Sequence, residues 1–96
     1  EFMFLFIGIV MLAPLIEEVF FRGTLFTVMD EKLGKYPAIL GTAVIFSLMH
    51  FDPIQALPLF LMGLIMGWLR SRSGSIVPSL VLHSLNNLMA LVLISI

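Results

Sequence analysis

The hydrophobic positions of this chain form four long runs, separated by short polar stretches. The runs cover residues 2–29, 37–51, 54–69 and 76–96. An apolar run of roughly 20 residues is needed to cross the hydrocarbon core of a bilayer as a helix. The pattern therefore predicts an all-α fold, a polytopic transmembrane bundle of about four spanning helices.

The polar stretches predict where the chain turns. Residues 30–36 are charged and contain Gly34, so we expect a loop there, and residues 70–75 predict a second loop. Asp52 and Pro53 predict a tight turn between the two middle runs. Pro14 lies inside the first run, where it predicts a kink. The chain has no repeat and no linker, so residues 1–96 form one domain.

Composition supports a lipid-covered protein. Of the residues, 60% are hydrophobic and 11% are charged, and a soluble domain of this length could not bury so much apolar surface. The absence of cysteine excludes disulfides, thiolate metal ligands and cysteine catalysis. No basic patch is present that would bind nucleic acid. We expect no signal peptide, because the first run follows Glu1 and has no basic segment before it.

The basic residues predict how the bundle is oriented. All of them fall at one end of the predicted helices: Arg22, Lys32, Lys35, Arg70 and Arg72. The positive-inside rule makes that end cytoplasmic. Both termini are then expected in the opposite compartment.

Two adjacent glutamates, Glu17 and Glu18, interrupt the first apolar run. A carboxylate near the bilayer centre costs several kcal/mol unless it is paired or hydrated. Glu18 and Arg22 are four residues apart on one helix face, which predicts an ion pair with a structural role. Glu17 has no such local partner, which leaves it free to accept a proton as a general base.

Among the other polar residues within the runs, His50, His83, Asn86 and Asn87 have the side chains that a hydrolytic site would need. Counted from the basic ends of their runs, Glu17, His50, His83 and Asn87 lie about 11 to 20 Å deep. We therefore expect these four to meet at one site. The alternative is that the histidines and the amides only form hydrogen bonds between helices. We expect that packing role for Asn86, which points away from the face that carries His83 and Asn87.

Two kinds of chemistry are compatible with these residue types. Glu17 with His50 could deprotonate a water molecule, while His83 with Asn87 could stabilise the oxyanion of a tetrahedral intermediate. A zinc ion held by one Glu and two His is the competing chemistry, although the H-E-x-x-H spacing is absent. Serine catalysis fits poorly, because no serine lies in a Gly-x-Ser-x-Gly or Ser–Lys setting. Gly63 and Gly67 predict close packing of two helices.

Three ordered segments resemble the motifs of the CPBP intramembrane proteases, the CAAX proteases and bacteriocin-processing enzymes also called the Abi family. They are EEVFFR at residues 17–22, FSLMH at 46–50 and HSLNN at 83–87. The resemblance covers residues 9–92 and implies a helical membrane protein whose cavity is open to the cytoplasmic side. Its family members generally carry further helices before the first motif, so we expect residues 1–96 to be the core domain.

The resemblance also implies residue roles and an activity. Glu17 and His50 would activate water, His83 and Asn87 would form the oxyanion site, and Glu18 and Arg22 would support it. We expect a glutamic endopeptidase without a cofactor, with zinc as the less favoured mechanism, acting on a membrane-associated peptide or protein. One alternative is a non-catalytic immunity or scaffold protein of the bacteriocin self-immunity type. A proton- or ion-coupled transport element is another.

Overall fold

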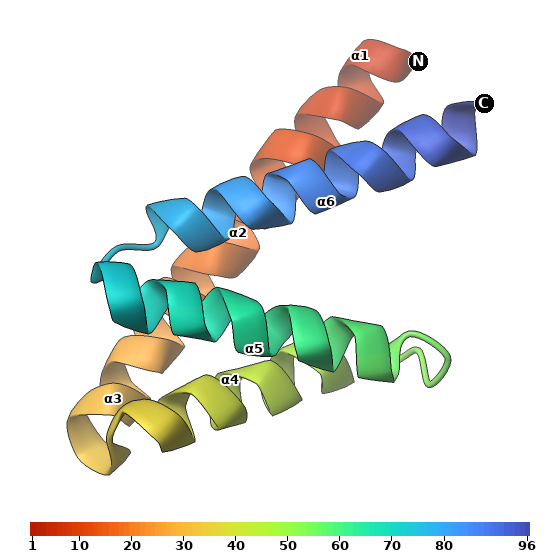
Figure 1. Cartoon of the computed structure of the whole chain (residues 1–96). Coiled ribbons are helices and arrows are strands. Elements are labelled where there is room, and N and C mark those ends of the chain that lie inside the picture. Colours follow the sequence, from red (N-terminus) through yellow and green to blue (C-terminus); the bar gives the residue numbers. More distant parts are fainter.

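The computed structural model describes all residues, 1–96, and contains helices but no strand (Figure 1). The first helix is continuous from Phe2 to Leu33. It comprises α1 (Phe2–Leu5), η1 (Phe6–Leu12), α2 (Ala13–Glu18), η2 (Val19–Leu25) and α3 (Phe26–Leu33). Three further helices follow: α4 (Lys35–Leu48), α5 (Ala56–Ser73) and α6 (Val77–Ser95). The all-α prediction is confirmed.

Two of these helices are long and apolar enough to cross a membrane. The first helix has 32 residues and a mean hydropathy of 2.2, and α6 has 19 residues and a mean hydropathy of 1.7. Large apolar side chains such as Phe4, Ile16 and Ile94 are exposed on them, as lipid contact requires. These features favour a membrane protein. Helix α4 has 14 residues and is about 21 Å long, less than the hydrocarbon thickness of about 30 Å.

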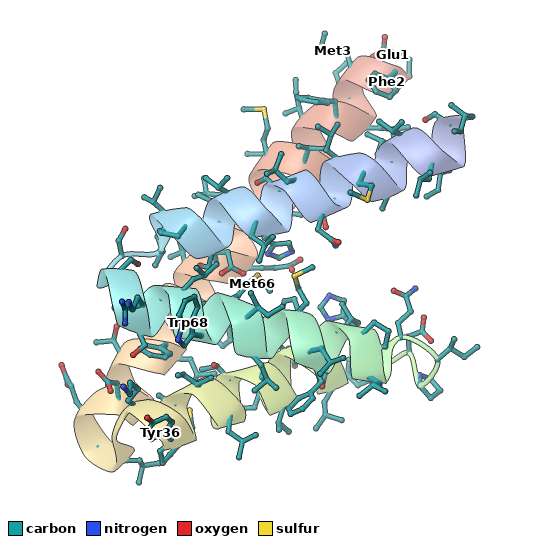
Figure 2. All side chains as sticks on the ribbon, viewed as in Figure 1. Glu1, Phe2, Met3, Tyr36, Met66 and Trp68 are labelled. Atoms are coloured by element: carbon teal, nitrogen blue, oxygen red, sulfur yellow. The ribbon has the colours of Figure 1, made fainter.

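The helices pack as two pairs. Helices α4 and α5 form an antiparallel hairpin, and α6 lies against η1 and α2. Figure 1 shows the N- and C-termini at the same end of the bundle. The small buried core between the pairs consists of Phe21, Phe46 and Met66. Figure 2 shows Met66 between the α4–α5 hairpin and α6.

The first turn is much shorter than expected. Residues 30–33 and 35–36 are helical, and only Gly34 interrupts the helix, with φ of 97°. Glycine has no Cβ and adopts this positive φ without strain, so one residue reverses the chain. The predicted loop over 30–36 was therefore wrong. The loop predicted for 70–75 is also shorter, because α5 continues to Ser73.

The turn at Asp52 and Pro53 is confirmed. Helix α4 ends at Leu48, and α5 begins at Ala56. The Asp52 carboxylate accepts a hydrogen bond from the Ile54 N–H at 3.1 Å, a local bond typical of aspartate in turns. His50 thus lies just beyond α4, at the mouth of this turn.

The first helix contains two wide π-helical stretches, η1 and η2, one on each side of the glutamates. The Ala13 N–H donates to the Gly8 carbonyl five residues back, directly before Pro14. Proline has no N–H to donate to the helical hydrogen-bond pattern. The wide turn before it accommodates the missing bond, so the helix continues through Pro14. π-helical turns occur frequently at functional sites.

Gly63 and Gly67 allow α5 to approach α4 closely, as predicted. A Cβ added at Gly63 would lie 2.9 Å from the Ala43 Cα, and one at Gly67 would lie 3.3 Å from the Ile39 Cα. The backbones of α4 and α5 are therefore in contact at Gly63 and Gly67, a line of contact that we call the glycine seam.

We expect Gly63→Ala to lower the free energy of unfolding by about 1–3 kcal/mol, because α4 must shift to admit the methyl group. Gly8→Ala is the matched control, since its added Cβ would meet no atom within 4 Å. Helix content followed through a sodium dodecyl sulfate titration in mixed micelles would measure both. Equal transition midpoints for the two variants would contradict the close seam.

Candidate active site

A cavity of about 310 Å³ opens between η1, α6 and the α4–α5 turn. All four residues predicted to meet, Glu17, His50, His83 and Asn87, line it. Two helices, the first helix and α6, and the α4–α5 turn supply them, so the convergence comes from tertiary packing. Apolar residues line most of the rest of the wall, among them Ile9, Leu59, Met62, Leu91 and Ile94.

Glu18 lies behind the cavity, fully buried, and accepts hydrogen bonds from three side chains. They come from Arg22 Nη1 at 3.0 Å, Ser79 Oγ at 2.8 Å and His83 Nδ1 at 2.8 Å. Buried carboxylates are tolerated only when they are paired and hydrogen-bonded. The predicted ion pair of Glu18 and Arg22 is confirmed. Ser79 was not predicted as a partner, although it lies four residues before His83 on the same face of α6.

Arg22 is also completely buried and links the first helix to α5. Its Nη2 donates to the Gly63 carbonyl at 3.1 Å, and its guanidinium carbon lies 4.8 Å from the centre of the Phe46 ring. The glycine seam therefore brings a backbone carbonyl within reach of this buried cation.

Arg70, on α5, forms hydrogen bonds with the first helix next to Arg22. The Phe26 N–H donates to the Phe21 carbonyl, so the Arg22 carbonyl loses its usual helical donor. Arg70 Nε supplies a replacement at 2.8 Å, and Arg70 Nη2 donates to Thr27 Oγ1 at 3.1 Å. The wide turn η2 is thus fixed by a side chain of α5, a role that the sequence did not indicate.

His83 lies between the two glutamates. Its Nδ1 is 2.8 Å from Glu18 Oε2, and its Nε2 is 3.4 Å from Glu17 Oε1. The ring is buried, whereas the Glu17 side chain is 36% exposed. Glu17 is therefore the carboxylate that reaches the cavity, and Glu18 is the one that holds the ring.

His50 faces the cavity from the end of α4. Its Nδ1 lies 2.7 Å from the Phe46 carbonyl oxygen, and because a carbonyl can only accept, Nδ1 carries the proton. The Nε2 of the neutral ring is then a free acceptor. The Phe46 ring packs edge-on against both His50 and His83, with centroids 4.8 and 5.7 Å apart.

Asn87 is fixed by a contact with the first helix. Its Nδ2 donates to the Ile9 carbonyl at 2.9 Å, which leaves its second N–H available. Asn86 lines the cavity as well and is exposed. The expectation that Asn86 serves helix packing was wrong, because the cavity is wide enough to include two neighbouring faces of α6.

Comparison with protein families assigns the chain to a family. A family model described as type II CAAX prenyl endopeptidase Rce1-like matches residues 1–89, which include all three motifs. The chain belongs to this family. Searches of curated proteins and of solved structures found no match. The Rce1-like assignment confirms the resemblance to CPBP proteases and supports the fold of a CAAX-protease-like intramembrane endopeptidase.

A metal ion does not fit the residues of this Rce1-like site as they lie. Glu17, Glu18 and His83 are close together, yet no group of three acidic or histidine side chains has the arrangement of metal ligands. Two of the three are already hydrogen-bonded to each other.

Two expectations concern the orientation of this Rce1-like chain. The positive-inside rule predicts a cytoplasmic basic end, and the family resemblance implies a cavity open to the cytoplasm. Most cavity-lining residues lie in the half of the bundle farther from the basic residues, among them Ile9, His50, Leu59 and Asn87. Figure 2 shows Tyr36 and Trp68 toward the basic end, with Glu1 at the opposite end. If the basic end is cytoplasmic, most of the cavity lining lies nearer the opposite side.

Proposed function

We propose that the chain is an intramembrane endopeptidase that hydrolyses a peptide bond of a membrane-associated protein or peptide. The observation that carries this proposal is the convergence of Glu17, His50, His83 and Asn87 on one cavity. Membership of the Rce1-like family supports a protease of this type.

Glu17 and His50 are the groups that would activate water. Both line the cavity, and Glu17 has no hydrogen bond shorter than its 3.4 Å contact with His83. His50 uses Nδ1 for the Phe46 carbonyl, which leaves Nε2 of the neutral ring as an acceptor. A water molecule between them could lose a proton to the carboxylate while it attacks the scissile carbonyl carbon. No cofactor is required for this step.

His83 and Asn87 are the groups that would stabilise the tetrahedral intermediate. Asn87 has one N–H left after its bond to Ile9, and His83 directs Nε2 toward the cavity. Fixed donors are effective because they need no rearrangement as charge develops on the carbonyl oxygen. The apolar wall that Ile9, Leu59 and Met62 provide suits an apolar substrate segment next to the scissile bond.

Cleavage of a peptide library by the chain in liposomes tests this proposal. We expect Glu17→Gln to reduce the cleavage rate by about 10²- to 10⁴-fold, because the amide cannot accept the proton of water. Glu31→Gln is the matched control, since Glu31 is exposed on α3 and lies outside the cavity. Chelator treatment should leave wild-type activity unchanged.

Other outcomes of that assay would indicate a different mechanism or a different function. Undiminished cleavage by Glu17→Gln would remove Glu17 from the mechanism, and loss of activity under chelation would favour a metallopeptidase. Absence of cleavage by folded wild-type protein would favour a non-catalytic immunity or scaffold role.

Orientation can be tested with single cysteines, because the chain contains none. By the positive-inside rule, we expect a membrane-impermeant thiol reagent to label Gln55→Cys, at the cavity, from outside intact cells. Glu31→Cys, at the basic end, should be labelled only after permeabilisation. The reverse pattern would mean that the cavity opens to the cytoplasm, as the family resemblance implied.

A further inference from the structure

We infer that Glu18 is a positioning residue that keeps a proton on Nδ1 of His83, so that His83 acts as the proton donor to the leaving amine. The position of the proton follows from hydrogen bonding alone. The catalytic consequence rests on the proposed function.

Glu18 must be ionised because of Arg22. Arg22 is fully buried, its guanidinium does not lose its proton in proteins, and the only carboxylate that it contacts is that of Glu18. A neutral Glu18 would leave this cation without a counter-charge in a buried site, which is strongly unfavourable. Ser79 adds a further donor to the same carboxylate.

An ionised Glu18 determines the tautomer of His83. A carboxylate only accepts hydrogen bonds, so the 2.8 Å contact requires an N–H at Nδ1. In the neutral ring, Nε2 is then an acceptor without a proton. His83 can donate from Nε2, to an oxyanion or to a leaving group, only when the ring carries both protons. The 3.4 Å contact of Nε2 with Glu17 allows the two groups to share that second proton.

This arrangement closes a proton cycle for peptide hydrolysis. Glu17 begins as a carboxylate and His83 as the charged imidazolium. The water oxygen bonds to the scissile carbon, and one water proton moves to Glu17. The C–N bond then breaks, and the amine nitrogen takes the proton from His83 Nε2. Finally the proton on Glu17 passes to His83 Nε2, which restores both groups and leaves an acid and an amine as products.

Nuclear magnetic resonance of the full chain in micelles tests the tautomer without any activity. The chain has two histidines, so labelling both ring nitrogens of histidine gives a simple spectrum that His50→Gln would assign. For folded wild type we expect the Nδ1 of His83 to carry a proton and to donate it to Glu18. An unprotonated Nδ1 in folded wild-type protein would overturn the inference.

Glu18→Gln and Ser79→Ala separate positioning from simple loss of structure. Both disturb the hydrogen bonds of the buried cluster, but only Glu18→Gln removes the anion beside His83. We expect Glu18→Gln to give the Nε2–H tautomer that a free ring favours, whereas Ser79→Ala should keep the wild-type pattern. An unchanged His83 spectrum in folded Glu18→Gln would also overturn the inference.

The peptide assay then tests the catalytic part. We expect Glu18→Gln to lower kcat by about 10²- to 10⁴-fold with little change in KM, because a proton donor is lost and substrate contacts are kept. Unchanged kcat together with an altered tautomer would overturn the proton-donor role of His83. Absence of cleavage by wild type would count against the proposed function, while the tautomer result would stand.

Discussion

Replacing Arg22 with Met is expected to lower the free energy of unfolding by about 3–5 kcal/mol. The substitution leaves the Glu18 carboxylate buried without its counter-charge, and the removal of one partner from a buried pair typically costs this much. It also removes the bond to the Gly63 carbonyl, which joins the first helix to α5. We therefore expect the two helix pairs to separate at a lower denaturant concentration.

A double-mutant cycle with Glu18→Gln measures this coupling. The double variant should be less destabilised than the sum of the two single variants, because no unpaired charge remains buried. Fluorescence of Trp68, the chain's only tryptophan, would follow unfolding in sodium dodecyl sulfate. Arg72→Met is the matched control, since Arg72 is exposed. Its free energy of unfolding should lie within about 0.5 kcal/mol of the wild-type value. Simple additivity in the cycle would argue against a coupled pair.

Replacing Phe46 with Ala is expected to cost about 3–5 kcal/mol and to reduce cleavage as well. Phe46 is 1% exposed, and truncation of a buried phenylalanine leaves a cavity that the surroundings fill only in part. The ring also contacts Arg22, His50 and His83. Its loss would free both imidazoles to leave the orientation that the proposed mechanism needs.

Two further variants make this second prediction specific. Phe46→Leu restores much of the volume but no aromatic edge, so it should recover stability more than activity. Phe4→Ala is the matched control, because Phe4 is 76% exposed on the first helix and its truncation removes no core packing. Equal stabilities of Phe46→Ala and Phe4→Ala in the same titration would contradict the central position of Phe46.

Local geometry explains which features of the site could be predicted. The pair of Glu18 and Arg22 and the edge-on contact of Phe46 with His50 each join residues four apart in a helical run of the sequence, so spacing alone indicates the contact. The choice of partner for His83 could not be predicted, because Glu17 and Glu18 are equally near it in sequence. Helix packing decided that Glu18 holds the ring and that Glu17 faces the cavity.

The turns and the π-helical stretches have weaker sequence signals than the contacts between residues four apart. Gly34 was recognised as part of a loop, but charged neighbours that remain helical made this loop look longer than it is. The two π-helical stretches have no sequence signal that we could identify, apart from Pro14 after the first. Each stretch rotates the residues that follow, so side-chain directions inferred from a regular helix change beyond it.

The sequence by itself determined the helical class, the membrane environment, the family and the four residues that meet at the cavity. These depend on hydropathy, spacing and depth, which are properties of each helix separately. Only the tertiary structure decided the partners: Arg22 with the Gly63 carbonyl, Asn87 with the Ile9 carbonyl, and His83 between two carboxylates. Such contacts depend on how each helix is rotated against the next, and a one-residue change turns a side chain by about 100°.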